Sequence, residues 1–461
     1  MKAMITRPIA RTTAQAYVSV IPDEALPSGD DRYVQLDAVR GKRNMARLLA
    51  NRLSDYEQAI KAGSPRAYAR SLITGHRGCG KTTELYRLQD LLVAENFAVV
   101  YFDASREFDL QKQVVSWWNI LLEMVLQVDE QLSQAPYHIQ VPDPLREEAV
   151  EWLAKVITKK TVRSEMMSSL TTDFSIGGVL PFFAKAKAAI KSLLQDSSSL
   201  VKEIESEAER RPTVLRKAVE EVVAYANAQL VAKGRHGLVV VVDGLEKIPL
   251  RSLVDGSTTH GALFIHNGNY LQSPPCHLIY TLPLGLLTQE KITEVFPERP
   301  HVMPMIHVRH ASGEEDGLAL HAMEDIIERR VLPELFAPGV VKSLALASGG
   351  HMRDFLFLVR EAAGEASGSA TITHDHADRA IAGLTDLYNR TIRQEFISPL
   401  HYVAQHGELP VEKHDGELVN LLLVLEYVND RRWSALHPCV AQAGRYVKAP
   451  RANKEEETPD S

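Results

Sequence analysis

One short stretch of the chain combines glycines, a lysine and a hydroxyl side chain at the spacing of a phosphate-binding loop. Residues 75–82 read GHRGCGKT and match the pattern G-x-x-x-x-G-K-[ST]. Glycines let backbone N–H groups turn toward phosphate oxygens, the lysine contacts the β- and γ-phosphates, and the hydroxyl reaches Mg²⁺. The predicted cofactors are therefore ATP or ADP with Mg²⁺, and the lysine is also expected to act in catalysis. The predicted nucleotide ligands in this P-loop are Gly75, His76, Arg77, Gly78, Cys79, Gly80, Lys81, Thr82 and Thr83.

The neighbouring sequence fits this interpretation. Residues 70–74, RSLIT, are typical of a short strand, and residues 83–92 carry helical periodicity. A loop between a strand and a helix places the positive end of the helix dipole at the phosphates. A glycine-rich turn without function is the alternative, and the strand–loop–helix context argues against it.

A second stretch supplies a carboxylate for the same site. Residues 237–243 read GLVVVVD, which is typical of a strand buried on both faces that ends in an acid. The C-terminal ends of parallel strands meet at one edge of a sheet, so Asp243 is expected beside the P-loop, where it and Thr82 would bind Mg²⁺. Glu246 is the predicted catalytic residue that orients or activates the attacking water.

Further apolar runs complete an α/β pattern. Residues 97–103, 277–281 and 302–308 are typical of strands and alternate with helical stretches. This alternation predicts a parallel sheet with helices on both faces, the α/β fold of a P-loop NTPase. Thr281 ends one run, where its hydroxyl would either bind the nucleotide or satisfy nearby backbone groups. The adjacent Trp117 and Trp118 are expected to pack in a core or an interface.

Changes of pattern along the chain predict its domain organisation. In residues 142–236, charge-laced helical stretches flank the apolar run 174–183. That run is expected to pack against its own helices, the alternative being a partner surface. The predicted segments are an N-terminal arm (1–35), whose first 22 residues are expected to be flexible, the first part of an ATPase core (36–141), a helical insertion (142–236), the second part of the core (237–320), a helical lid (321–396), a winged-helix domain (397–447) and a disordered tail (448–461).

Composition narrows the function classes. The chain has 461 residues, of which 45% are hydrophobic, and a net charge of −7, so it has no global attraction to nucleic acid or anionic membranes. No apolar run approaches the length of a bilayer span, and no membrane partner is expected. Cys79, Cys276 and Cys439 lie far apart without metal-ligand spacing, which favours a cytoplasmic location.

Two features of the C-terminal third bear on function. Residues 348–353 read SGGHMR, where the glycine pair ends one helix and Arg353 falls in the first turn of the next. Residues 418–427, a turn at Asn429 and Asp430, and residues 433–437 predict a β-hairpin. We interpret this hairpin as the wing of a winged-helix domain, with an ordinary terminal hairpin as the alternative.

Taken in order, the P-loop, Asp243, Thr281 and the Gly-Gly-x-x-Arg segment resemble the motifs of AAA+-type ATPases. The sequence Asp243-Gly244-Leu245-Glu246 resembles that of NACHT and other STAND ATPases. The lid and hairpin sequences are similar to those of bacterial STAND-like ATPases, some of them encoded in anti-phage defence loci. The resemblance covers about residues 36–125 and 237–440. Lys247 departs from it, because NACHT proteins often carry another acid there.

This resemblance implies a STAND-like molecular switch. ATP would open or oligomerise the chain, which would then control a separate effector or sensor protein. Arg353 on the lid would contact the phosphates and so respond to the nucleotide. Lys247 implies slow hydrolysis. Arg299 and Arg309 are the candidates for an arginine that one subunit contributes to its neighbour.

The alternative is a DNA-binding AAA+ ATPase of the origin-recognition or transposition-regulator type. The winged helix would then read duplex DNA, with Arg431 and Arg432 near the hairpin tip contacting the backbone. The acids Glu426 and Asp430 and the negative net charge count against this reading. A nucleotide-stabilised scaffold without turnover is a third interpretation.

Overall fold

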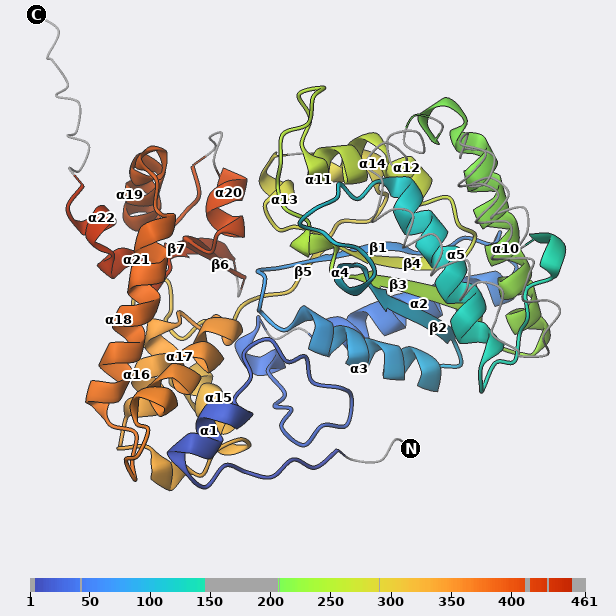
Figure 1. Ribbon diagram of the computed structural model, residues 1–461. Helices are drawn as coiled ribbons and strands as arrows, with labels where there is room; N and C mark the ends of the chain where they lie inside the picture. The colour runs from blue at the N-terminus through green and yellow to red at the C-terminus, as the bar shows by residue number, and fades with distance from the viewer. Residues whose placement is uncertain are drawn as a thin grey trace, which may run out of the picture.

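The computed structural model describes residues 5–41, 44–145, 206, 208–289, 291–410, 415–428 and 431–449. These residues form two parts that lie side by side, a sheet covered by helices and a helical part that includes a β-hairpin (Figure 1). The apolar run 174–183 and nearly all of the predicted tail lie outside the described residues.

A five-stranded parallel sheet forms the centre of the first part. The strand before the P-loop, β1, lies between β4 and β5, and β4 separates it from β3, which ends at Asp243. Every strand pair in this sheet is parallel, so the predicted α/β P-loop NTPase fold is confirmed. In spatial order the strands are β2 (Ala98–Asp103), β3 (Leu238–Asp243), β4 (His277–Thr281), β1 (Arg70–Thr74) and β5 (His301–Val302).

Strand β5 is much shorter than the sequence predicts. A strand was expected over residues 302–308, but only His301 and Val302 pair with β1. Pro304 has no N–H to donate, so the hydrogen-bond ladder does not continue through it. Met305 and Ile306 are nevertheless buried, and they belong to the segment that connects the sheet to the helical part.

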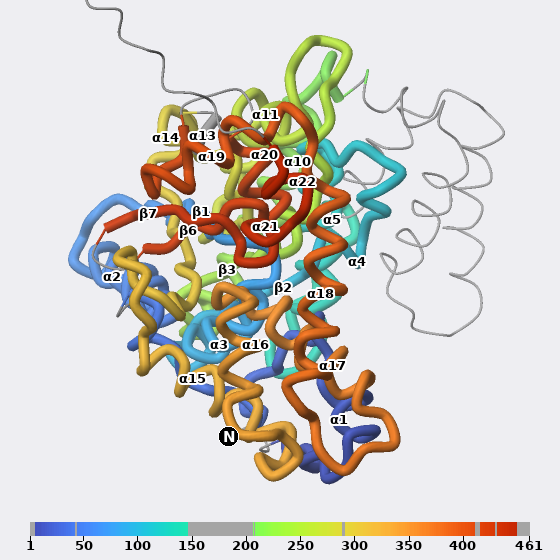
Figure 2. The backbone as a smooth tube through the Cα atoms, turned by 90° about the vertical axis from the view of Figure 1, so that its left-hand side faces the viewer, coloured from blue at the N-terminus to red at the C-terminus, as the bar shows by residue number. Residues whose placement is uncertain are grey.

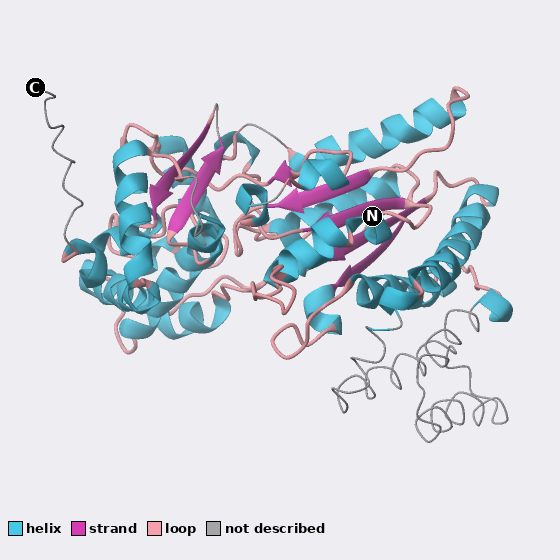
Figure 3. Ribbon diagram, turned by 90° about the horizontal axis from the view of Figure 1, so that it is seen from above, coloured by secondary structure: helices cyan, strands magenta, loops and turns pink. Residues whose placement is uncertain are grey.

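Helices cover both faces of the sheet because its central strands are apolar on both sides (Figure 3). In β3, Val239 and Val241 pack in the core on the α2 and α3 side, while Val240 and Val242 pack in the core on the α5 and α10 side. These four helices are α2 (Met45–Lys61), α3 (Lys81–Ala94), α5 (Trp117–Ser133) and α10 (Pro212–Ala232).

Two predictions about this core have different outcomes. Trp117 and Trp118 are both buried, and Trp117 stacks on Tyr270 with 4.3 Å between ring centroids, so their packing role is confirmed. Helix α10 packs against α5 in the same core. It therefore belongs to the sheet part and not to a separate insertion, because its apolar stripe is buried there.

The second part is built from helices around its own core (Figure 2). Strands β6 and β7 pair antiparallel, which confirms the predicted β-hairpin, whereas the winged-helix interpretation stays a prediction. The elements of this part are α15 (Gly317–Glu328), α16 (Val340–Ala347), α17 (Met352–Glu365), α18 (His374–Thr391), α19 (Ile397–His406), α20 (Asp415–Asn420), β6 (Val424–Val428), β7 (Arg432–Leu436), α21 (Pro438–Gln442) and α22 (Gly444–Val447).

The N-terminal segment is not a flexible arm over the residues that the structure describes. Helix α1 (Thr13–Ser19) packs on α17, where Tyr17 contacts Gly364 and lies 4.9 Å beneath the guanidinium of Arg360. Ala10, Ala16 and Val20 are buried in the core of the helical part. The expectation of a flexible arm is wrong for residues 5–22, because apolar contacts with distant parts of the chain hold this segment in place.

Short elements connect these helices and strands. They are η1 (Asp37–Val39), α4 (Ala104–Glu107), η3 (Leu245–Lys247), α11 (Thr259–Gly261), η4 (Ala262–His266), α12 (Gly268–Leu271), α13 (Leu286–Gln289), α14 (Ile292–Val295), η5 (Pro333–Leu335) and η6 (Gln394–Phe396). Within the described ranges, no helix is both long enough and apolar enough to cross a bilayer.

Gly350, just before α17, lies against the connecting segment. Gly350 has a φ of 78°, and a Cβ atom built on it would lie 1.9 Å from the carbonyl oxygen of Ile306. Gly368 has a similar φ of 82°, but no atom lies within 4 Å of its Cβ position. Both glycines therefore have a left-handed backbone conformation. Only Gly350 also lies so close to a neighbouring segment that a side chain would clash with it.

We expect Gly350→Ala to destabilise the protein more than Gly368→Ala does. A left-handed conformation alone costs an alanine about 1–2 kcal/mol, and the close approach to Ile306 adds backbone displacement, for a total of roughly 2–4 kcal/mol. Thermal unfolding of both variants beside the wild type measures the difference. Equal losses of stability in the two variants would show that the connecting segment moves away from the new methyl group at no cost in free energy.

Candidate nucleotide site

The P-loop joins the end of β1 to the start of α3, and its glycines are required by their surroundings. Gly75 has a φ of 149°, and a Cβ there would lie 2.8 Å from the carbonyl oxygen of Met303. Gly78 has a φ of 85°, and a Cβ there would lie 2.7 Å from the Cβ of Arg353. The loop is thus closely packed against the connecting segment and the start of α17, and side chains at Gly75 and Gly78 would prevent this.

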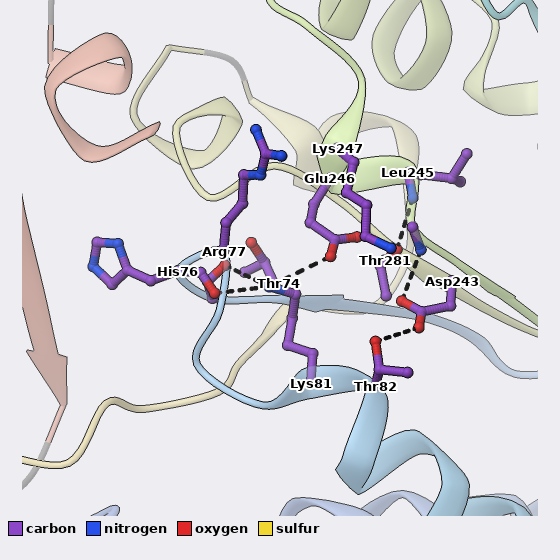
Figure 4. A network of polar contacts seen from close by, with 12 residues as sticks. Thr74, His76, Arg77, Lys81, Thr82, Asp243, Leu245, Glu246, Lys247 and Thr281 are labelled. Atoms are coloured by element: carbon purple, nitrogen blue, oxygen red, sulfur yellow. Dashed lines mark hydrogen bonds and ion pairs between the residues drawn. The ribbon is translucent and has the colours of Figure 1, made fainter. Parts of the chain in front are cut away.

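Lys81 lies where the loop opens toward Glu246. Its Nζ donates hydrogen bonds to the carbonyl oxygens of Gly75 and His76, both at 2.9 Å, and lies 3.7 Å from Oε1 of Glu246. The side chain is only 3% exposed. A buried ammonium group is therefore held between the P-loop and the predicted catalytic carboxylate (Figure 4).

Asp243 is fully buried and bonded from three sides. Its Oδ2 accepts hydrogen bonds from the hydroxyls of Thr82 (2.7 Å) and Tyr101 (2.8 Å), and its Oδ1 accepts one from the N–H of Gly244 (2.7 Å). Burial and the nearby charge of Glu246 raise the pKa of Asp243. The two residues predicted to bind metal, Thr82 and Asp243, are therefore in direct contact.

These groups fit Mg²⁺. Hydroxyl and carboxylate oxygens are the ligands that this ion prefers, and a cation would favour the ionised form of the Asp243 carboxylate. Glu246 lies close by and is 7% exposed, and its Oε2 has no hydrogen-bond partner in the described part of the chain. Thr82 and Asp243 would hold the ion, and the free oxygen of Glu246 would be available to a water molecule.

Thr281 is placed behind this group. It is fully buried, and its Oγ1 accepts a hydrogen bond of 3.1 Å from the N–H of Leu245. That bond holds the turn after Asp243, which carries Glu246. Among the two expectations for Thr281, the geometry therefore matches the backbone role, and a direct contact with the nucleotide stays a prediction.

Asp103 is a site residue that the sequence analysis missed. It ends β2 directly beside Asp243 on β3, and it lies 3.2 Å from Nζ of Lys247, which also bonds the Ser105 hydroxyl at 2.9 Å. Burial raises the pKa of Asp103, but Ser105 and Lys247 outweigh it and the net pKa is lowered. The signal was present, since Asp103 ends a buried strand just as Asp243 does.

A cavity of about 440 Å³ opens in front of the P-loop, a volume suited to a small-molecule ligand. The P-loop residues Gly78, Gly80, Lys81, Thr82 and Thr83 line one side. Further lining residues come from the N-terminal segment, between Pro22 and Arg40, and from α15 and α17. The apolar part of the lining consists of Pro22, Ala25, Leu26, Val34, Leu36, Ile326, Met352 and Leu356.

The N-terminal segment contacts the P-loop directly, which the sequence analysis did not predict. Nη2 of Arg40 donates to the carbonyl oxygen of Cys79 at 2.7 Å, and the N–H of Leu26 donates to Oγ1 of Thr83 at 3.1 Å. No local pattern marks these residues, because their partners lie about 40 to 60 positions away in the sequence. Both contacts hold the part of the loop that leads into α3.

The predicted arginines fall into two groups. Arg353 lines the cavity, and its Nε lies 2.5 Å from Oδ1 of Asp23 in the N-terminal segment. Arg299 is exposed, and Arg309 is exposed and lies 3.5 Å from Glu315. Neither lines the cavity of its own chain, so both remain candidates only for a contact with a neighbouring subunit.

Comparison with known proteins does not identify the function of this site. No protein-family model matches the sequence, and no curated protein matches it significantly. An ORC1 protein of Aeropyrum pernix, solved in complex with DNA, is 16% identical, with a TM-score of 0.33, over 89% of this chain and 95% of that chain. An ORC2 protein of Aeropyrum pernix, solved as ADPNP–ADP complexes, is 12% identical, with a TM-score of 0.37, over 87% of this chain and 90% of that chain.

Sequence identities and TM-scores this low give no information about the function of this chain. The sheet order, the P-loop between β1 and α3, and the buried Asp243 define the class, which is an α/β protein with the P-loop NTPase fold.

We expect Lys81→Ala to weaken ATP binding by about tenfold to a hundredfold. The change removes a buried charge-assisted contact to phosphate, which is worth about 1.5–3 kcal/mol. Calorimetric titration with ATP and Mg²⁺ measures the loss. Lys217→Ala, on the outer side of α10, is the matched control and should bind as the wild type does. Wild-type affinity in Lys81→Ala would contradict the assignment of the site.

Proposed function

We propose that this chain is an AAA+-type ATPase that works as a nucleotide-dependent switch between its sheet part and its helical part. One observation carries the proposal: three successive P-loop residues are hydrogen-bonded to the helical part. The carbonyl oxygen of Gly78 accepts from the N–H of Arg353 at 3.2 Å. That of Arg77 accepts from Nε2–H of His351 at 2.5 Å, and Nε2 of His76 accepts from the N–H of Glu426 at 2.8 Å.

The protonation state of His76 supports this arrangement. Burial lowers the pKa of His76, and the nearby His351 and Lys81 lower it further. A neutral imidazole has one nitrogen that accepts a hydrogen bond, as the N–H of Glu426 requires. The second residue of the P-loop is therefore bonded to strand β6 of the hairpin.

A buried carboxylate extends the P-loop contact of His351 further into the helical part. Asp354 is 8% exposed and lies 3.2 Å from Nδ1 of His351 and 3.1 Å from Nε2 of His437. The hydroxyl of Tyr388 donates to it at 2.6 Å. Burial raises the pKa of Asp354, but the two histidines outweigh it and the net pKa is lowered. Packed polar groups therefore connect the carbonyl of Arg77, through His351 and Asp354, to His437, the residue that follows the hairpin.

The proposed chemistry is hydrolysis of the γ-phosphate of ATP. Mg²⁺, when bound, would neutralise charge on the β- and γ-phosphates. Lys81 would contact the same phosphates, Thr82 and Asp243 would hold the ion, and Glu246 would orient the attacking water. We infer slow turnover from the resemblance to STAND ATPases, as Lys247 replaces an acid that is frequent there.

Two outputs of such a switch are proposed. In the first, the chain forms a nucleotide-dependent homo-oligomer and controls a separate effector or sensor protein, as STAND ATPases do, with anti-phage defence as one setting. In the second, it handles DNA, as origin-recognition ATPases do. Helices α19 and α20 followed by the hairpin, with Arg431 exposed, favour the second output. Against it, Arg432 is paired with Glu426.

Two measurements separate these outputs. Titration of duplex DNA over a range of salt concentrations, with and without ATP, reports DNA binding through its salt dependence. Mass measurement of the apo, ADP and ATP forms reports nucleotide-dependent oligomers. DNA binding that responds to ATP favours the second output, and ATP-dependent oligomers without DNA binding favour the first.

We expect Glu246→Gln to bind ATP and to hydrolyse it about 10²–10⁴-fold more slowly, because an amide does not accept a proton from water. Asp243→Asn should instead weaken the binding that depends on Mg²⁺. Steady-state phosphate release and nucleotide titration of both variants give the comparison. Normal turnover in Glu246→Gln would move the catalytic role to another residue.

We expect Arg353→Ala to lose most of the difference between the ATP-bound and ADP-bound states. One charge-assisted contact to the γ-phosphate is worth about 1.5–3 kcal/mol, which shifts a population about tenfold to a hundredfold. Protease protection of the helical part, compared between the two nucleotides, measures this difference.

Asp23→Asn is the matched control for Arg353→Ala. It removes the partner that Arg353 has in this structure and leaves the guanidinium in the cavity. If Arg353 responds to phosphate, Asp23→Asn keeps the ATP–ADP difference. If the Asp23 pair is merely structural, both variants lose thermal stability equally with either nucleotide and keep the difference, and the switch proposal then fails while the nucleotide site stands.

A further inference from the structure

The segment that connects the sheet to the helical part brings together two histidines and an aspartate. It runs from the end of β5 to the start of α15 (Figure 1). Nε2 of His307 lies 3.0 Å from Oδ2 of Asp316, and Nε2 of His310 lies 3.8 Å from the same oxygen. One ligand atom from each residue lies within 4.8 Å of the others. Neither the nucleotide site nor the proposed switch uses this group.

The backbone holds the three side chains at this spacing. Residues 308–316 fold back on themselves: the N–H of Asp316 donates to the carbonyl of Val308 at 3.0 Å, and the N–H of His310 donates to that of Glu314 at 2.8 Å. Gly313 makes the turn with a φ of 89°. The cluster is therefore built by a hydrogen-bonded loop and does not depend on chance side-chain positions.

Asp316 is fixed by its other carboxylate oxygen. Oδ1 caps α15 by accepting hydrogen bonds from the N–H groups of Leu318 (2.9 Å) and Ala319 (3.0 Å). Oδ2 consequently points at the two imidazoles. Metal-binding carboxylates are commonly held by such outer hydrogen bonds, which orient the ligating oxygen.

The positive charges near the cluster are paired with an acid, so they repel an entering cation only weakly. The two basic side chains beside the loop, Arg309 and Lys342, lie 3.5 Å and 2.7 Å from Glu315. Their charges are thus largely compensated by that acid. His310 is 47% exposed, whereas His307 and Asp316 are each 12% exposed, so an ion can enter from the side of His310.

We propose that His307, His310 and Asp316 form a zinc site. Imidazole nitrogens with one carboxylate oxygen are ligands typical of Zn²⁺, whereas Mg²⁺ and Ca²⁺ prefer oxygen alone. A tetrahedral zinc ion requires ligand atoms about 3.3 Å apart, close to the 3.0 and 3.8 Å found here. In the part of the chain that the structure describes, no other group of three such residues meets the same spacing. The fourth position would face solvent.

A local role without metal is the rival account. On that account Asp316 caps α15 and accepts a hydrogen bond from His307, and His310 lies nearby without function. Asparagine caps helices about as well as aspartate does but lacks the anionic oxygen. Asp316→Asn therefore separates the two accounts, because it preserves the cap and removes the proposed ligand.

The test is Zn²⁺ titration of the full chain, without nucleotide, in competition with a chromophoric chelator. We expect one saturable equivalent in the wild type, weakened at least about tenfold in Asp316→Asn and in His310→Ala. His321→Ala is the matched control, since His321 lies on α15 beside Glu324 and Asp325 without a second histidine. It should bind as the wild type does.

A second readout reports the ligands themselves. Co²⁺ in place of Zn²⁺ should give the intense visible absorption of a tetrahedral site in the wild type and not in Asp316→Asn. Absence of a saturable equivalent in the wild type overturns the proposal. So does wild-type affinity in Asp316→Asn, or loss of the site in His321→Ala.

Discussion

The P-loop lies between the two parts of the molecule, and three of its polar groups find hydrogen-bond partners in the helical part. The carbonyl groups of Arg77 and Gly78 accept hydrogen bonds from His351 and Arg353 at the start of α17, and His76 is bonded to the hairpin. The helical part thus shares hydrogen bonds with the loop expected to hold phosphates. Movement of that loop would break or make these bonds, and this constraint is the basis of the coupling that we propose between the nucleotide site and the helical part.

The acids at the edge of the sheet are stabilised in different ways, and the difference matters for chemistry. Asp243 is held by the hydroxyls of Thr82 and Tyr101, whereas Asp103 is held by the ammonium of Lys247. Lys247 therefore compensates the charge of Asp103, and Oε2 of Glu246 has no hydrogen-bond partner among the residues that the structure describes. The residue that departs from the STAND pattern has its own electrostatic role in this site.

The connecting segment between β5 and α15 determines how the two parts meet. It is closely packed, since the carbonyl of Ile306 approaches Gly350 and that of Met303 approaches Gly75, so lid and P-loop glycines are both required along it. Its last residues fold into the hydrogen-bonded loop that carries the histidine–aspartate cluster. Few conformations satisfy all of these contacts at once, which favours one defined arrangement of the two parts.

The sequence by itself determined the features that depend on local pattern. The P-loop, the buried strands, the C-terminal hairpin and the acid at the end of β3 were predicted because glycine spacing, runs of valine and strand-end positions act within a few residues. The predicted strand over residues 302–308 is wrong for an equally local reason, because Pro304 has no N–H to donate to the neighbouring strand. Only the tertiary structure decided the rest: the contact of Arg40 with the P-loop and the ordered N-terminal segment. Their partners lie tens to hundreds of residues away, and burial between distant segments leaves no periodic signal in the chain.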